Sequence, residues 1–193
     1  IEIKKNKIYL NNKPLYQRLV LDQGFYPSGI WTAPSDKDLK NDIVLSMKAG
    51  FNGARLHEKV FEDRFHYWAD KLGYITWAEF PNWGMNENAK DSETAFMNEW
   101  PRIVNYLKNH PSIITWTPFN ETNTLECNAQ HKKLMRKAYA ITKKIDPTRP
   151  VNETSGYQHQ KTDIWTVHHY QPNPEKLKVA LNPKKGVYRN FPH

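Results

Sequence analysis

The chain has 193 residues, enough for one domain with a substantial core, and its length does not require a second domain. Aromatic residues make up 13% of it, which permits flat ligand-stacking surfaces and equally permits a core of large side chains. The net charge of +8 raises nucleic acid as a partner. The lysines are scattered, however, without a recognition-helix motif or an Arg-rich arm, so we favour a solvated outer face and no nucleic-acid partner.

Cysteine content and hydropathy exclude further classes of protein. Cys127 is the single cysteine, which excludes an intrachain disulfide and a cysteine-based zinc site. No apolar run approaches the roughly 20 residues that span a bilayer, so we expect a soluble chain without a membrane partner and favour the cytoplasm. The chain starts at Ile1 without a signal-like segment. We therefore expect a fragment of a longer polypeptide, whose targeting segment could lie upstream.

Hydrophobic patterning predicts a short lead-in and one main domain. Residues 1–14 alternate loosely and end in a turn signal, which predicts an edge hairpin before a main domain over residues 15–193. The predicted strands cover residues 15–21, 51–57, 74–81, 109–121, 149–154 and 164–170. The predicted helices cover residues 35–50, 60–72, 92–107 and 134–145. Ser35 and Ser92 are the expected N-caps, Gly73 is an expected C-cap, and Pro101 should kink or divide its helix.

Strands that alternate with helices indicate an α/β domain with a parallel sheet. A doubly wound nucleotide-binding fold is disfavoured because no G-x-G-x-x-G or G-x-x-x-x-G-K-[ST] motif occurs. A (β/α)8 TIM barrel is favoured because polar residues follow the ends of several strands. Such a barrel usually needs about 250 residues, so we expect an incomplete one with about six βα units. These strand-end residues are Arg55, His57, Glu79, Asn120, Glu121, Ser155, His168, His169 and Tyr170.

One strand end carries the clearest chemical signal. Residues 109–121 read as a helix stop, a buried strand, and then the amide of Asn120 and the carboxyl of Glu121. An apolar floor beneath such a carboxyl can raise its pKa and suit it to proton transfer. An ordinary strand-end glutamate is the alternative. The three histidines at strand ends invite a metal site, but no H-x-x-x-H spacing or carboxylate triad supports one, so we predict no metal and no cofactor.

Three runs carry a family resemblance. They are residues 50–57 (GFNGARLH), 65–80 (FHYWADKLGYITWAEF) and 109–121 (NHPSIITWTPFNE). With residues 148–151 and the predicted strand that ends at Tyr170, they cover most of the chain. In this order the chain resembles the catalytic barrel of family 2 glycoside hydrolases, the group of β-galactosidases, β-glucuronidases and β-mannosidases.

The resemblance implies a retaining, exo-acting β-glycosidase of β-galactosidase type that hydrolyses O-glycosidic bonds of a carbohydrate substrate. It matches Glu121 to the general acid/base, Asn120 to the amide that binds the sugar 2-hydroxyl, Tyr170 to the tyrosine beside the nucleophile, and Arg55 to a supporting arginine. The nucleophile is a second glutamate on a seventh strand, which this chain does not reach. We therefore expect the missing remainder of the polypeptide to supply it, and this chain alone to be inactive.

Four further residues are assigned to the sugar site. His57 and His168 are expected as polar lining, and Trp83, in a loop, as a sugar platform. Glu79 is expected at the site either in contact with substrate or in an ion pair with Arg55. The segment His57-Glu58-Lys59 departs from the Ser-His-Tyr-Pro-like turn of many relatives. A non-catalytic carbohydrate-binding or scaffold relic of the barrel is the alternative function, and the sugar that is recognised is left open.

Overall fold

The structure is a computed structural model, which describes residues 1–122, 127–182 and 184–187. Its N-terminal segment forms a three-stranded antiparallel sheet, one strand more than a hairpin, in the order β1-β2-β3. These strands are β1 (Glu2–Lys4), β2 (Lys7–Leu10) and β3 (Lys13–Pro14). Both connections turn through Asn or Lys residues with positive φ, the backbone conformation that asparagine tolerates best among non-glycine residues.

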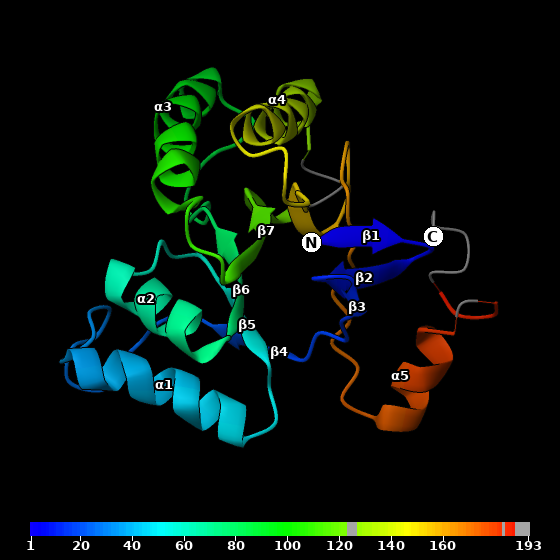
Figure 1. The fold of residues 1–193 in the computed structure, drawn as a ribbon. Coiled ribbons are helices and arrows are strands. Elements are labelled where there is room, and N and C mark those ends of the chain that lie inside the picture. Colours follow the sequence, from blue (N-terminus) through cyan, green and yellow to red (C-terminus); the bar gives the residue numbers. More distant parts are fainter. Residues whose placement is uncertain (123–126, 183, 188–193) are drawn as a thin grey trace.

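The main body confirms the predicted parallel α/β architecture. A four-stranded parallel sheet runs in the order β4-β5-β6-β7, and a second parallel pair joins β8 to β9. The strands are β4 (Leu19–Asp22), β5 (Gly53–Leu56), β6 (Ile75–Glu79), β7 (Ile113–Thr117), β8 (Phe119–Thr122) and β9 (Thr154–Tyr157). The helices are α1 (Asp36–Lys48), α2 (Asp63–Leu72), α3 (Lys90–Leu107), α4 (Ala129–Ile145) and α5 (Pro174–Ala180). Figure 1 shows α1 beside α2 and α3 beside α4, with α5 apart from both pairs.

Individual residues explain where two helices begin or end and how closely two strands approach. The side chain of Ser35 accepts a hydrogen bond from the Asp38 amide and caps α1, as predicted. Gly73 ends α2 in the left-handed conformation, also as predicted. Gly53 permits the close approach of β5 to β6, because a Cβ there would lie 2.1 Å from the Ile75 carbonyl oxygen. The first two βα units are therefore held by the residue types that their geometry requires.

Aromatic side chains fill the larger core cluster between the sheet and the α3–α4 pair. Trp100 and Trp116 are completely buried and meet edge to face, with ring centroids 5.9 Å apart. Phe96 stacks on Phe119 at 4.8 Å, which brings α3 against the start of β8. Rigid aromatic packing of this kind stabilises the sheet beneath the strand ends. The high aromatic content therefore serves the core at these positions.

The predicted strand over residues 109–121 is divided in the structure. Ladder pairing with β6 ends at Thr117, Pro118 follows, and β8 then pairs with β9. Proline has no N–H to donate, so it interrupts a ladder at that residue. The predicted strand at 149–154 is also wrong in extent. Only Val151 bridges to Trp116, and the strand proper begins at Thr154.

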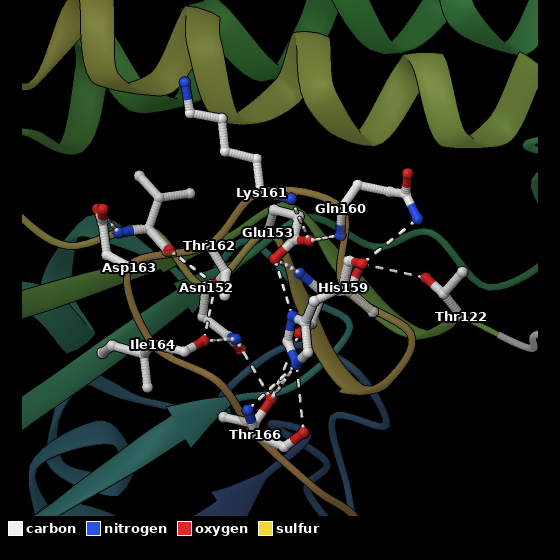
Figure 2. A network of polar contacts seen from close by, with 12 residues as sticks. Thr122, Asn152, Glu153, His159, Gln160, Lys161, Thr162, Asp163, Ile164 and Thr166 are labelled. Atoms are coloured by element: carbon white, nitrogen blue, oxygen red, sulfur yellow. Dashed lines mark hydrogen bonds and ion pairs between the residues drawn. The ribbon is translucent and has the colours of Figure 1, made fainter. Parts of the chain in front are cut away.

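The predicted strand over residues 164–170 is wrong, because the structure has no strand there. The segment before His168 is instead held by the buried carboxylate of Glu153 (Figure 2). That carboxylate accepts hydrogen bonds from His159 Nδ1 at 2.9 Å and from the Gln160 and Lys161 amides at 2.5 and 3.1 Å. The Thr166 amide donates to His159 Nε2. The Ile164 carbonyl oxygen accepts from Asn152 Nδ2 at 2.8 Å, so backbone groups of this segment bond to side chains instead of a neighbouring strand.

Two helix predictions also need correction. α3 begins at Lys90 rather than after Ser92, and it continues through Pro101 without division. Proline removes one backbone hydrogen bond, but the buried side chains of Trp100 and Val104 hold the helix on both sides of it. α4 begins at Ala129 because Asn128 caps it by accepting from the His131 amide. Among the described helices, none has the length and apolar character needed to cross a membrane.

His66 on α2 gives the fold a pH-dependent stability. Its side chain is 0% exposed, and neither ring nitrogen has a hydrogen-bond partner among the described residues. Burial lowers the pKa of His66 to about 4, so the folded chain keeps the ring neutral where the unfolded chain protonates it. The free energy of unfolding is therefore unaffected by His66 protonation above pH 6.5, the ordinary pKa of His. It falls by about 3 kcal/mol as the pH is lowered from 6.5 toward 4.

Replacing His66 by Phe tests this contribution. Urea unfolding of the chain and of His66→Phe from pH 8 to pH 4 should give curves that diverge, because the variant lacks this one proton-linked loss. All other titrating groups remain in both proteins, so the difference between the curves isolates His66. Parallel curves would show that the ring is not held neutral.

Candidate functional site

Seven of the eight predicted site residues line one cleft of about 390 Å³ at the carboxyl ends of the strands. These are Arg55, His57, Trp83, Asn120, Glu121, His168 and Tyr170. They come from β5, from the loop after β6, from β8, and from the segment that follows the network in Figure 2. The carboxyl ends of parallel strands are where α/β folds collect their functional side chains. The structure therefore brings together residues that are far apart in the sequence, such as Arg55 and His168, which are 113 positions apart and in contact.

Arg55, near the end of β5, joins the floor of the cleft to its walls. Its guanidinium forms an ion pair with Glu79 and donates to Asn120 Oδ1 at 2.5 Å. Its Nη1 lies 3.3 Å from His168 Nε2, and its Nη2 lies 2.9 Å from His57 Nδ1. A planar guanidinium with five N–H donors can orient several partners at once, which lysine cannot do. Arg55 therefore fixes the relative positions of the other site residues.

Glu79 does not reach the cleft. Its side chain is 2% exposed and lies among Arg55, His57 and the backbone amide of Glu58, which donates to it at 3.1 Å. The ion-pair alternative for Glu79 is thus present, and contact with substrate is not supported by its position. A buried carboxylate with this many partners holds Arg55 in place. Its role is to support the site from below.

Glu121 sits at the tip of β8 in an unusual backbone conformation. Its φ is +46°, in the left-handed region that non-glycine residues rarely adopt. One carboxylate oxygen, Oε1, accepts hydrogen bonds from His168 Nδ1 at 2.5 Å and from the Tyr170 hydroxyl. Strained residues of this kind are frequent at sites where a side chain must be aimed. The Glu121 carboxylate is therefore held in one orientation at the cleft wall.

A single tautomer of His168 suits its contacts with Glu121, Ser155 and Arg55. Nδ1–H donates to Glu121, and Nε2 accepts from Ser155 Oγ at 3.0 Å and from Arg55. Gly156 makes room for this ring, because a Cβ there would lie 2.7 Å from it. The backbone at Gly156 has φ +83°, which also favours glycine. His168 thus connects the Arg55 network to the Glu121 carboxylate.

The charge state of Glu121 differs from the expectation. Partial burial tends to raise the pKa of its carboxyl, but hydrogen bonds from Tyr170 and His168 outweigh burial and lower the pKa below its ordinary value. The same bond raises the pKa of Tyr170 to about 12. Glu121 is therefore an anion at neutral pH in this chain. The prediction that the apolar floor raises its pKa is wrong because polar donors surround the carboxylate.

Asn120 is held so that one donor is left over. Arg55 binds its Oδ1, and its backbone amide donates to Asn82 Oδ1 at 2.9 Å. Its Nδ2 has no hydrogen-bond partner among the described residues. Because the side-chain oxygen is committed to a cation, the amide cannot flip without losing that bond. Asn120 thus keeps a buried, unsatisfied N–H donor in a residue that lines the cleft.

Trp83 and His57 form one side of the cleft. The Trp83 side chain is 59% exposed and meets the His57 ring edge to face, with centroids 4.8 Å apart. Trp77 and Trp116 are buried, so they belong to the core. An exposed indole beside a polar cleft is suited to stack on a flat ligand face. Trp83 fits the platform that its loop position suggests.

Three buried groups have metal-ligating atoms near one another. His57, Glu58 and Glu79 offer atoms within 4.8 Å of each other. The Arg55 guanidinium already lies against His57 and pairs with Glu79. It supplies the positive charge that the Glu79 carboxylate needs. We therefore assign no metal to this cluster.

Sequence reasoning missed part of the lining. Leu21 and Gln23 also line the cleft, as does His169, which was predicted at a strand end but not assigned to the sugar site. A second cleft of about 240 Å³ shares Trp83, Asn120 and Glu121 with it. Gln23 follows β4 directly, so the strand-end rule could have found it. The second cleft adds His131 from the start of α4, which no sequence signal connects with β8. Glu121 thus lies between two hollows.

Comparison with known proteins identifies the family. The chain matches the family described as glycosyl hydrolases family 2, TIM barrel domain, over residues 1–189. It is 30% identical over 172 residues to a beta-galactosidase of Photobacterium profundum, covering 85% of the chain and 16% of that protein. It is 29% identical over 123 residues to a beta-glucuronidase of Bacteroides fragilis, covering 60% of the chain and 17% of that protein. The chain thus spans about a sixth of the length of these relatives.

A solved structure shows the same fold. A β-glucuronidase from Ruminococcus gnavus in complex with D-glucuronic acid has a TM-score of 0.71 to this chain. The match covers 78% of this chain and 26% of that one, at 22% identity. With the parallel sheet and the polar strand ends, these findings agree on one assignment. The chain belongs to family 2 of the glycoside hydrolases and carries part of that family's TIM-barrel domain.

Proposed function

We propose that this chain is the acid/base half of a retaining, exo-acting β-glycosidase, with Glu121 as the general acid/base. The observation that carries the proposal is the Glu121 carboxylate, held in one orientation by His168 and Tyr170 at the wall of the 390 Å³ cleft. A group that transfers a proton to a leaving oxygen must be aimed before the reaction begins. Family membership and the β-glycosidases among the relatives support a β-glycoside as the substrate.

The other residues of the cleft support the same chemistry. The spare Nδ2 of Asn120 is suited to the sugar 2-hydroxyl, a contact that strengthens in the transition state. Arg55 holds Asn120 in place, and Trp83 offers a face for the ring. Of the described residues that line the 390 Å³ cleft, Glu121 is the only carboxylic acid. A retaining reaction needs a second carboxyl about 5 to 5.5 Å away, so we propose that sequence beyond His193 supplies the nucleophile.

The lowered pKa of Glu121 is compatible with this division. An acid that donates a proton near neutral pH needs a raised pKa, and a second carboxylate nearby would raise it through like-charge repulsion. With Tyr170 and His168 alone, the carboxyl stays ionised. The nucleophile would therefore complete the pair and also set the protonation state of Glu121.

The test extends the chain with the sequence that its gene encodes after His193; we call this product the extended polypeptide. We expect it to hydrolyse an aryl β-glycoside, and proton NMR of the first product should show the retained β-anomer. The 193-residue chain alone should not turn over. Inverted product would contradict the retaining mechanism. A gene that lacks a strand ending in Glu within about 40 residues, roughly one further βα unit, would favour the non-catalytic carbohydrate-binding relic.

A further inference from the structure

The segment His57-Glu58-Lys59, directly after β5, contains three consecutive polar residues that are all buried. Buried polar side chains are retained where they have specific partners. His57 belongs to the Arg55 network described above. Glu58 and Lys59 take no part in the proposed chemistry, and each reaches a different loop at the cleft mouth. Their partners define what these two residues do.

Glu58 bonds to the loop that carries Trp83. Its side chain is 8% exposed, and its Oε2 accepts a hydrogen bond from the Trp83 backbone amide at 2.8 Å. The backbone of Glu58 has φ +56°, a strained value for glutamate, and its own amide donates to Glu79. Glu58 thus bonds to the Trp83 loop through its side chain and to Glu79 through its backbone. The Trp83 indole then meets His57 at 4.8 Å.

Lys59 fastens a different loop, the one that follows β4. Its side chain is also 8% exposed, and its Nζ donates to the carbonyl oxygens of Gly24 at 3.2 Å and Trp31 at 2.7 Å. Gly24 follows Gln23, which lines the cleft. A Cβ at Gly24 would lie 2.8 Å from Nζ, so the loop and the ammonium are in close contact. Two neighbouring residues thus hold two separate walls.

We propose that Glu58 is a positioning residue, which fixes the Trp83 loop through the Trp83 amide and so sets the sugar-binding wall of the cleft. Lys59 fixes the loop after β4. The inference rests on the proposed function for its kinetic test, whereas its spectroscopic test does not depend on that function. Because Trp83 is proposed to stack on the sugar and takes no part in proton transfer, loosening its loop removes binding that substrate and transition state share. Such a loss raises KM and leaves kcat unchanged.

The spectroscopic test uses the 193-residue chain and the ¹H–¹⁵N resonance of the Trp83 amide, assigned with Trp83→Phe. Burial raises the pKa of Glu58 to about 7, so this resonance should titrate near neutral pH. Glu79 and His57 also lie near Glu58, so Glu58→Gln serves to isolate its contribution. The titration should vanish in that variant. A Trp83 amide that does not titrate, or that titrates equally in Glu58→Gln, would overturn the proposal.

The kinetic test uses the extended polypeptide and an aryl β-glycoside. Glu58→Leu should raise KM about tenfold with kcat within about twofold, the loss expected for one charge-assisted hydrogen bond. Glu58→Gln, which keeps an acceptor oxygen, should stay within about threefold in KM. Glu99→Leu, at an exposed position on α3, is the matched control and should change neither constant. An unchanged KM in Glu58→Leu, or kcat falling as much as kcat/KM, would overturn the proposal.

The experiments distinguish failure of the proposed function from failure of the positioning role of Glu58. An inactive wild-type extended polypeptide would contradict the proposed function, and the Trp83 titration would still decide the role of Glu58. An active enzyme that is indifferent to Glu58→Leu would contradict only the role of Glu58. If Glu58→Leu does not fold, the titration of the unmodified chain and of Glu58→Gln decides the matter.

Discussion

Replacing Glu121 by Gln in the extended polypeptide is expected to lower kcat/KM for an alkyl β-glycoside by between about 10²- and 10⁴-fold. Glutamine keeps the size of the side chain and an acceptor for the His168 and Tyr170 bonds, but it has no proton to give to the leaving oxygen. An alkoxide leaves poorly without protonation, so the whole loss of proton transfer is seen as a decrease in kcat/KM. Steady-state kinetics with wild type and variant measure the effect.

Glu99→Gln is the matched control for that experiment, because Glu99 lies at an exposed position on α3. It should leave kcat/KM within about twofold of wild type. Thermal unfolding of both variants shows whether either loses structure. If Glu121→Gln turns over the alkyl glycoside as fast as Glu99→Gln, Glu121 is not the general acid.

Replacing Arg55 by Met is expected to have the largest effect on stability. It leaves the Glu79 carboxylate, 2% exposed, without its cationic partner. Breaking a buried ion pair from one side typically costs about 3 to 5 kcal/mol of the free energy of unfolding, because an uncompensated charge stays buried. The loss should also free Asn120 and His168, which Arg55 contacts. Urea unfolding of the 193-residue chain measures the cost.

An exposed arginine of the same chain supplies the control. Arg64 on α2 pairs with Asp36 at 2.6 Å, and both side chains are about half exposed. Arg64→Met should therefore cost no more than about 1 kcal/mol. The double variant Arg55→Met with Glu79→Met removes both buried charges and should be more stable than Arg55→Met alone. If Arg55→Met lowers the free energy of unfolding no more than Arg64→Met does, the Arg55–Glu79 pair does not have the stabilising role assigned to it.

Much of the site could be predicted because it follows from strand ends. Arg55, Asn120 and Glu121 each lie at or near the last residues of a parallel strand, and such ends meet at one edge of the sheet. The start of α1 could be predicted because the Ser35 side chain bonds to a nearby backbone amide. The end of α2 could be predicted because Gly73 readily adopts the left-handed conformation. These features depend on residues within one or two turns of each other. Local chemistry is what a single sequence exposes best.

The features that were missed depend on distant partners. The segment over residues 164–170 has the composition of a strand, but its backbone bonds to side chains outside the segment, as where the Ile164 carbonyl oxygen accepts from Asn152 (Figure 2). The pKa of Glu121 was expected to rise because its strand is apolar, and it is lowered by donors from a segment 47 and 49 residues away. Likewise, Glu58 meets Trp83 only in the folded chain. Such pairings leave no periodicity in the sequence.

The most direct measurement of the central claim is the dependence of the Glu121→Gln effect on the leaving group. The wild-type to variant ratio of kcat/KM should be large for alkyl β-glycosides, whose oxygen needs the proton. It should approach 1 for a dinitrophenyl β-glycoside, whose oxygen leaves without protonation, because kcat/KM reports only the steps through bond cleavage. A ratio that stays the same across the series would contradict the claim and would show that Glu121 acts in binding or structure.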